Sequence, residues 1–386
     1  MKKKIISLAS LTVILLLSGC WDVSEPQRMY YIHGVGIDFK DGQYEISMQI
    51  IDFSNVAKSD QPIPTPTQAE IGISKGKTME EAFFKLYRSI DQKVFWGHMT
   101  YLLLSEEAMK NEHAIPIIDS LLRFRETRYQ IWVYCTQDSI KDILLITPIL
   151  NKSLTSSKLS TPLDSGAKET IIQPVNLRNL MISLNEPSHE ISIPLVTINK
   201  NHWETSEQSP KETALTGVGI LSKDGFKGFI KDNAVRGSQW MSDEKNRGEI
   251  TFKLENGDQD HLTVGIEKLK VEIKPIVKSN QVKFDVDIKL NANINGFKGK
   301  LTTDEIRKRI VKEIKKDIKE TYEEGLQLDT DIYRLSEYLY RYNVKEWKKL
   351  EEDGKVPLTK DSISNINVYV NKINPGRKTF EETLNN

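Results

Sequence analysis

The stretch VKFDVDIKLNANI, from Val282 to Ile294, alternates apolar and polar residues along its whole length. Successive side chains of a β-strand point to opposite faces of a sheet, so this pattern predicts a long strand. One face of that strand should be buried and the other should contact water, as in an antiparallel sheet that covers a core on one side.

The segments around this strand predict the rest of a compact unit. Strands are expected before it over 249–254 and 262–274, joined by turns at 255–258 and 279–280. A second helix over 331–350 and a returning strand over 363–370 are expected near the end of the chain. With one more helix between, the order β-β-β-α-α-β predicts an antiparallel sheet with helices on one face.

The helix that follows the alternating strand has the clearest start signal in the chain. Thr302 and Glu305 have the spacing of a capping box, in which each side chain binds the other residue's backbone N–H. Isoleucines then recur every four residues with charged residues between them, which predicts a helix with one apolar stripe. These isoleucines are Ile306, Ile310, Ile314 and Ile318.

The N-terminal half contains shorter predicted elements. Thr78 and Glu81 form another capping box before an apolar stripe that ends at Ile90. Strands are expected over 43–53, 100–104, 129–135 and 190–198, and helices over 105–111, 114–124, 139–146 and 177–184. Gly34-Val35-Gly36 and Gly217-Val218-Gly219 are interpreted as strand glycines that allow close packing.

These elements predict a multidomain α+β protein with mostly antiparallel sheets and helices packed on one face. At 386 residues the chain is long enough for two or three domains. The expected division is a removed segment over 1–19, an α+β domain over 20–148, a smaller middle domain or extension over 149–245, and the C-terminal unit over 246–380.

The overall composition excludes several classes of protein. The chain has 54 basic and 54 acidic residues, and nucleic-acid binding is not expected without a basic excess. Two cysteines exclude a disulfide-rich scaffold and a four-cysteine zinc site. Cys135 lies in an apolar predicted strand and is interpreted as a small core residue.

The first twenty residues have the features of an export signal. Three lysines follow Met1, and a largely apolar run extends from Ile5 to Leu17, which is too short to span a bilayer. Leu17-Ser18-Gly19-Cys20 then resembles a bacterial lipobox, in which Cys20 receives diacylglycerol and becomes the new N-terminus. An ordinary signal peptide that ends near a cysteine is the alternative.

Lipidation at Cys20 has two consequences. Buried acyl chains hold a protein firmly on a membrane, because each methylene contributes roughly 0.8 kcal/mol. Loss of Lys2, Lys3 and Lys4 with the signal leaves 51 basic residues against 54 acidic ones, so the mature chain is slightly acidic. The remainder is expected to be a tethered body outside the cytoplasm.

A search for catalytic motifs returns none that is specific. The six histidines are at least thirteen residues apart, which leaves only a metal site assembled from distant residues. Ser-x-x-Lys occurs three times without its partner motifs, and neither G-x-S-x-G nor a P-loop occurs. We therefore expect no enzymatic activity, no metal and no cofactor.

The last third contains two candidate contact surfaces. The lysine-rich helix from Arg307 to Lys319 is interleaved with acids, so a solvated face is favoured over a lipid-headgroup patch. Aromatic residues concentrate at protein interfaces, and they crowd the predicted last helix. They are Tyr333, Tyr338, Tyr340, Tyr342 and Trp347.

The sequence after the lipobox resembles the Ger(x)C family, the lipoprotein C subunits of nutrient germinant receptors in endospore-forming bacteria. The similar motifs run in order along the chain: Cys20-Trp21-Asp22, an early Glu25, Gly34-Val35-Gly36-Ile37-Asp38, Gly76-Lys77-Thr78, His98, Thr216-Gly217-Val218-Gly219 and Trp347. The sequence departs from the family at Tyr333-Arg334-Leu335, where a Gly- and Phe-containing turn is frequent, and at Asn343-Val344, where a proline commonly precedes the tryptophan.

This resemblance implies a non-catalytic protein with a mixed α+β fold, tethered to the outer face of the spore inner membrane. It implies a complex with two multi-spanning subunits, one of them transporter-like. Trp21 suits the headgroup level of a bilayer, and Asp22 and Glu25 are candidates for contact with a partner subunit. The alternatives are a substrate-binding lipoprotein of a transporter, which would need parallel sheets, and a lipid-anchored wall hydrolase.

Overall fold

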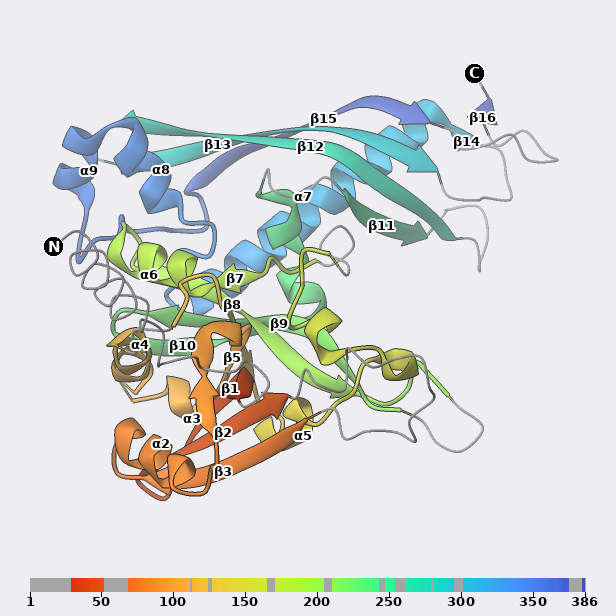
Figure 1. The fold of residues 1–386 in the computed structure, drawn as a ribbon. Helices are drawn as coiled ribbons and strands as arrows, with labels where there is room; N and C mark the ends of the chain where they lie inside the picture. The colour runs from red at the N-terminus through yellow and green to blue at the C-terminus, as the bar shows by residue number, and fades with distance from the viewer. Residues whose placement is uncertain are drawn as a thin grey trace, which may run out of the picture.

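The computed structural model describes residues 29–51, 69–111, 113–123, 127–164, 171–204, 210–242, 247–253, 261–278, 281–294, 301–374 and 384–385. Within these ranges the chain forms two larger β-sheets, which lie one above the other in Figure 1. The predicted lipidation site, the residues that follow it and the predicted turns at 255–258 and 279–280 lie outside the described residues.

The first sheet has ten strands, and eight of them follow the order β10-β9-β8-β6-β5-β1-β2-β3, while β4 pairs with β1 and β7 with β6. We call it the N-terminal sheet. Its strands are β1 (Met29–Lys40), β2 (Gln43–Ile51), β3 (Glu70–Gly76), β4 (Lys93–Phe95), β5 (Tyr101–Ser105), β6 (Trp132–Thr136), β7 (Val175–Asn176), β8 (Glu190–Asn199), β9 (Glu212–Ser222) and β10 (Gly225–Lys231).

The centre of the N-terminal sheet is parallel, which differs from the antiparallel pairing expected for most of the protein. β1 pairs in parallel with β5, β5 with β6, and β6 with β8, whereas the outer pairs are antiparallel. All five residues of β5 are buried, as is typical of parallel strands covered on both faces. Helical crossovers between β5, β6 and β8 return the chain to the same edge, which makes these strands parallel.

Helices cover both faces of this sheet rather than one. The helices are α2 (Met79–Tyr87), α3 (Glu106–Met109), α4 (Ala114–Arg123), α5 (Ile140–Leu144) and α6 (Leu177–Asn185). Apolar residues of α2, α3, α4 and α6 join one core, whereas α5 and Leu159 pack in a separate core on the other face. Short 3-10 turns also occur at η2 (Trp96–His98), η3 (Ile149–Asn151) and η4 (Leu154–Ser156).

The strand glycines lie where neighbours approach closely, as their spacing predicted. A Cβ atom on Gly34 would come within 2.5 Å of the Tyr101 ring. A Cβ on Gly217 would lie 2.5 Å from the carbonyl oxygen of Ile230, and one on Gly219 would lie 2.9 Å from the Cys135 sulfur. Side chains at these positions would push neighbouring strands or helices apart.

The second sheet, which we call the C-terminal sheet, has the strand order β11-β12-β13-β15. Its strands are β11 (Arg247–Lys253), β12 (His261–Lys278), β13 (Gln281–Ile294) and β15 (Ile363–Asn374). The alternation that predicted β13 is confirmed, since Val282, Phe284 and every second residue to Ile294 are buried. β15 pairs with β13 in parallel, which differs from the antiparallel sheet expected for this unit, because three helices intervene between the two strands.

Helix α7 (Thr303–Gln327) covers one face of the C-terminal sheet. The Thr302–Glu305 capping box is confirmed in both directions, and the four predicted isoleucines are all buried. The 3-10 helix η5 (Asp232–Trp240) packs on α7, where the Trp240 indole N–H donates to Asp317 over 2.9 Å. A minor pair of strands, β14 (Leu301–Thr302) and β16 (Leu384–Asn385), lies near the start of α7.

The helix expected over 331–350 is divided in two. α8 (Leu335–Tyr342) ends at Asn343, and α9 (Val344–Leu350) begins directly after it. The Asn343 side chain accepts a hydrogen bond from the Glu346 N–H at 3.2 Å, which caps α9. The apolar periodicity continues through this break, so periodicity alone did not predict it.

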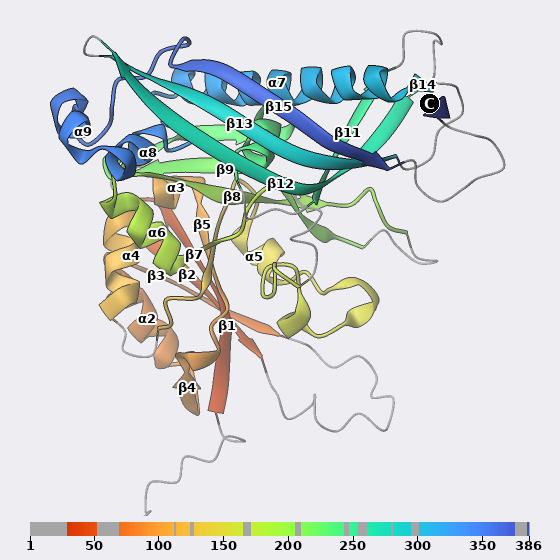
Figure 2. The same cartoon turned by 90° about the horizontal axis from the view of Figure 1, so that it is seen from above.

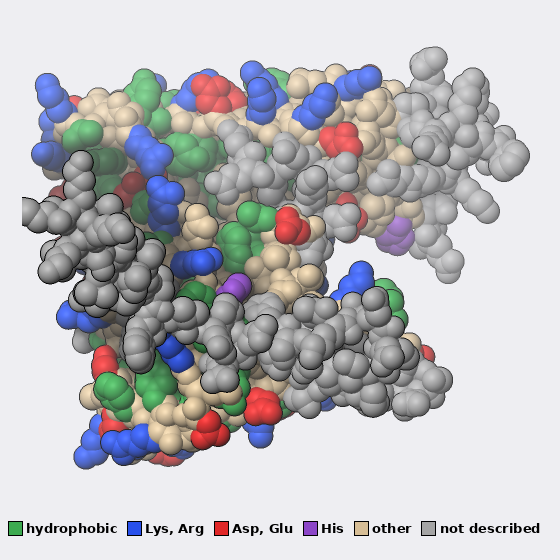
Figure 3. Space-filling view, in the orientation of Figure 1, with side chains coloured by type: hydrophobic (Ala, Val, Ile, Leu, Met, Phe, Trp, Pro, Cys, Tyr) green, Lys and Arg blue, Asp and Glu red, His purple; other side chains and the backbone are tan. Residues whose placement is uncertain are grey.

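The outer face of the C-terminal sheet is polar. Asp285 accepts hydrogen bonds from Ser364 and Asn365, and Asn367 donates to Asp287. Figure 3 shows Lys and Arg side chains interspersed with Asp and Glu over this part of the molecule. The described helices of this unit, α7, α8 and α9, all contribute to the core on the opposite, apolar face of the sheet, as expected.

Residues 149–245, expected as a middle domain or an extension, contribute β8, β9 and β10 to the N-terminal sheet. Figure 2 shows that the C-terminal sheet and α7 lie on the side of the molecule where β8 and β9 run. β9 and β10 contact η5, and β10 also contacts α7, so the last strands of the first sheet lie against these two helices.

Candidate functional site at the junction of the two sheets

The structure describes only some of the residues that the sequence analysis singled out. Cys20, Trp21, Asp22 and Glu25 lie outside the described residues, so their roles stay predictions. Cys135 is fully buried, and burial raises the pKa of its thiol to about 12. A core role for this residue is confirmed. Among the described residues, no group of His, Cys, Asp and Glu is arranged to hold a metal ion.

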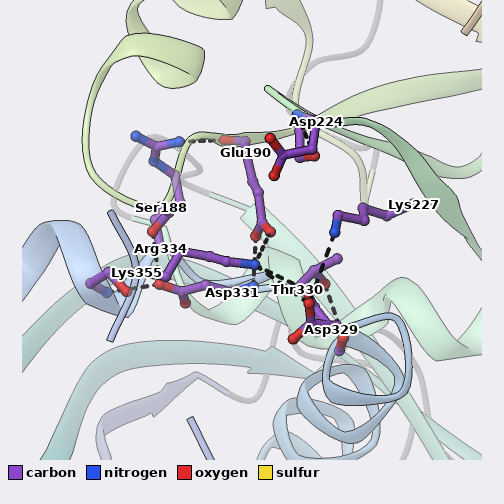
Figure 4. A network of polar contacts seen from close by, with 12 residues as sticks. Ser188, Glu190, Asp224, Lys227, Asp329, Thr330, Asp331, Arg334 and Lys355 are labelled. Carbon is purple, nitrogen blue, oxygen red and sulfur yellow. Dashed lines mark hydrogen bonds and ion pairs between the residues drawn. The ribbon is translucent and has the colours of Figure 1, made fainter. Parts of the chain in front are cut away.

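A buried polar cluster joins the N-terminal sheet to the C-terminal unit (Figure 4). We call it the junction, and it consists of Ser188, Glu190, Asp331, Arg334 and Lys355. Glu190, the first residue of β8, is 3% exposed. Its carboxylate accepts from the Lys355 ammonium at 2.8 Å and from the Asp331 N–H at 2.7 Å. One side chain of the first sheet thus holds two segments of the second unit.

Asp331 continues the junction from the opposite side. Its carboxylate accepts from the Ser188 hydroxyl at 2.8 Å and from the backbone N–H groups of Leu335 and Ser336, each at 2.7 Å. These N–H groups belong to the first turn of α8, which has no intrahelical partner for them. The same carboxylate therefore caps α8 and ties it to the loop before β8.

Arg334 directly precedes α8 and belongs to the junction. Its φ angle is 52°, a left-handed conformation that favours glycine. The guanidinium donates to the carbonyl oxygens of Glu190, Ser183 and Pro187, and to the Glu337 carboxylate. These contacts link Arg334 to β8, to α6 and to the segment between them.

The charges of Glu190 and Lys355 in the junction affect each other's pKa. Burial raises the pKa of the Glu190 carboxyl, although Lys355 and the Asp331 N–H act in the opposite direction. Burial alone would lower the pKa of Lys355, but the neighbouring Glu190 carboxylate reverses this and the pKa lies above its ordinary value. We therefore describe Glu190 and Lys355 as an ion pair.

Two hollows flank the junction. One of about 480 Å³ lies between α6, η5 and α8, with Glu186, Glu337 and Arg341 on its wall. The other, of about 670 Å³, lies between β10, the end of α7 and residues 352–360. The wall charges of the first hollow pair with each other, since Arg341 contacts both Glu186 and Glu337. This arrangement suits holding two units in one orientation rather than chemistry on a substrate.

Sequence reasoning missed the junction. Glu190 and Asp331 are 141 residues apart, and no local pattern predicts that pairing. The one available signal was Asp331 before an apolar helical stripe, which is typical of a helix start. The aromatic residues at the end of the chain differ in their exposure to solvent. Tyr333 is buried, whereas Tyr342 is 73% exposed.

Comparison with known families gives two consecutive matches. A family model described as the spore germination protein N-terminal domain matches residues 22–198. A second, described as spore germination B3/GerAC-like, C-terminal, matches residues 216–376. The chain belongs to the Ger(x)C family. The resemblance seen in the sequence is thereby confirmed, and the boundary between the two matches falls between β8 and β9.

Individual relatives of this Ger(x)C chain are distant but nearly full-length. Spore germination protein KC of Bacillus subtilis (strain 168) is 21% identical over 91% of this chain and 90% of its own length. Spore germination protein B3 of the same strain is 24% identical over 88% of this chain and 89% of its own. A solved structure titled as the GerBC protein has a TM-score of 0.55 and 15% identity, covering 88% of this chain and 96% of that one. It supports the same fold.

Proposed function

We propose that this protein is the lipid-anchored C subunit of a nutrient germinant receptor, required for spore germination. The observation that carries the proposal is the order of the two germination-protein family matches, which together run through most of the chain. The lipobox-like Leu17-Ser18-Gly19-Cys20 supplies the anchor, which would place the body on the outer face of the spore inner membrane.

In this proposal the protein is an assembly and signalling component without catalytic activity. Its partners would be two multi-spanning receptor subunits, one of them transporter-like. The described helices include none that is long and apolar enough to cross a membrane. The junction would hold the two sheets in a fixed orientation. A displacement of one unit by a partner would then also move the other unit.

A substrate-binding lipoprotein of a transporter would need parallel sheets, and the centre of the N-terminal sheet is parallel. The two consecutive germination-family matches favour the receptor subunit instead. No observation on the described residues favours a wall hydrolase.

Isolation of the tagged protein from spore membranes tests the proposal. Two multi-spanning proteins should co-purify with it, and Cys20→Ala should release it from the membrane fraction, whereas Cys135→Ala should not. Co-purification of an ATPase and a permease would instead support the transporter. Recovery of the Cys20→Ala variant in the membrane fraction at the normal level would contradict the anchor.

Asp22→Ala with the lipid intact tests the proposed partner contact. We expect less of the two multi-spanning subunits to co-purify and germination to slow. Unchanged recovery of both subunits, together with normal germination, would leave Asp22 only a role near the lipid anchor.

A further inference from the structure

Four strands of the N-terminal sheet, β1, β4, β5 and β6, run parallel and begin at the same edge, and β8 continues this direction beside β6. β4 and β5 pair with β1 in parallel, and β6 pairs with β5 in parallel. Figure 2 shows the start of β1 and the short strand β4 projecting together at one end of the molecule. We call this end the start edge, and it includes the first residues of these strands and the segments directly before them.

Aromatic side chains gather at the start edge. Tyr31 of β1 contacts Phe95 of β4 with ring centroids 5.8 Å apart. α2 runs from the far end of β3 back towards this edge, and its last residue, Tyr87, accepts a hydrogen bond from the Trp96 indole at 2.7 Å. Phe84 is 62% exposed and Tyr129, just before β6, is 54% exposed.

Cations surround these rings. Lys93 begins β4, and Arg88 directly follows α2, and both are exposed. Arg128 is also exposed. The pKa of His98 is lowered mainly by burial and further by the positive charge of Arg128, which lies nearby. Arg178 is exposed and its backbone N–H donates to the Tyr129 carbonyl at 2.8 Å. Asp91 is an exposed acid between Arg88 and Lys93, so the edge carries basic residues in excess.

The chain outside the structure ends close to this surface. β1 begins at Met29, so the nine residues from Cys20 to Arg28 span at most about 32 Å when fully extended. β1 itself has 12 residues and is about 40 Å long. A lipid on Cys20 therefore keeps the start of β1, rather than its far end, near the bilayer.

We propose that the start edge is the surface with which the protein rests on an anionic lipid bilayer. This inference relies on the proposed lipid on Cys20. Tyrosine and tryptophan rings favour the headgroup level of a bilayer, where one end of the side chain is apolar and the other is wet. Lys93, Arg128 and Arg178 would contact lipid phosphates, whereas the C-terminal sheet would face away from the membrane.

Site-specific quenching tests this orientation. The lipidated mature chain is bound to vesicles of phosphatidylcholine and phosphatidylglycerol that contain a headgroup quencher. One variant carries a fluorophore at Tyr129→Cys and the matched control at Tyr369→Cys, a tyrosine 48% exposed on β15. Cys135 is buried and its thiol pKa is raised to about 12, so it should not react with the label.

We expect strong quenching at position 129 and little at position 369. Equal quenching at both positions, or none at 129 in protein that floats with the vesicles, would overturn the orientation. Failure of the lipidated chain to float would instead contradict the anchor. Quenching at 129 that requires the multi-spanning subunits in the membrane would assign the edge to a protein partner and overturn the lipid proposal.

The cations are tested separately in a chain with Cys20→Ser, which lacks the anchor. Each exposed cation near an anionic surface strengthens binding by about fivefold. Lys93→Glu and Arg128→Glu should therefore each weaken binding to phosphatidylglycerol vesicles by at least that factor, and Lys348→Glu on α9 should not. Equal effects of the variants at Lys93 and Lys348 would contradict the proposed contact.

Discussion

His33 is a buried titratable side chain in the core of the N-terminal sheet. It is 1% exposed, and its Nε2 atom lies 2.8 Å from the Ser160 hydroxyl and 3.2 Å from the Leu154 carbonyl oxygen. Burial disfavours the charged imidazolium and lowers the pKa of His33 from 6.5 to about 4. The folded protein therefore contains a neutral ring across most of the physiological range.

This shift predicts acid sensitivity. Below pH 6.5 the unfolded chain binds a proton at His33 that the folded chain does not bind until about pH 4. The free energy of unfolding should fall as the pH drops through this window, by up to about 3 kcal/mol from this residue. Urea unfolding of the mature chain and of the His33→Gln variant at several pH values measures this pH dependence of the free energy of unfolding. An identical pH slope in both proteins would contradict the prediction.

The Glu190–Lys355 pair predicts coupled effects of substitution. Lys355→Ala leaves a carboxylate that is 3% exposed without its cation, and should lower the free energy of unfolding by about 2 kcal/mol. Glu190→Gln removes that buried charge, so the double variant should lose less than the sum of the two single losses.

An exposed pair supplies the control for this measurement. Lys360 and Glu323 lie 3.8 Å apart with exposed side chains, and Lys360→Ala should change stability by less than about 0.5 kcal/mol. Strict additivity at Glu190 and Lys355 in urea unfolding would show that the junction is not a coupled pair.

At the scale of elements, the sequence pattern predicted those helices and strands that are determined by residues close to one another in the chain. The alternation from Val282 to Ile294 predicted β13, and Thr302 with Glu305 predicted the start of α7. Parallel pairing at the centre of the N-terminal sheet was not predicted, because it depends on crossovers that return the chain to one edge. The junction could not be predicted either, because its partners meet only after both units have folded.

The apolar stripe of α7 gives an element-scale prediction. Ile314 is fully buried between α7 and the C-terminal sheet, so Ile314→Ala should lower the free energy of unfolding by about 2–5 kcal/mol. Lys312→Ala, on the exposed side of the same helix, should cost less than about 0.5 kcal/mol. Urea titration of both variants measures the difference, and similar losses would contradict the assigned face.

At the scale of the whole molecule, three features point to one arrangement. The lipobox-like start predicts a tether at Cys20, the start edge is aromatic and basic, and the junction holds the C-terminal unit to Glu190, the first residue of β8. In the proposed function, the tether would give the protein a defined orientation and the junction would connect its two parts rigidly. The germination-family matches give this arrangement its biological setting.

Nutrient-triggered germination of spores tests the central claim most directly. The measurement compares spores without the gene, in a strain that lacks paralogous receptors, with spores complemented by the native gene or by Cys20→Ala. We predict that germination is lost on deletion, restored by the native gene and not restored by Cys20→Ala. Full germination without the gene would contradict the account.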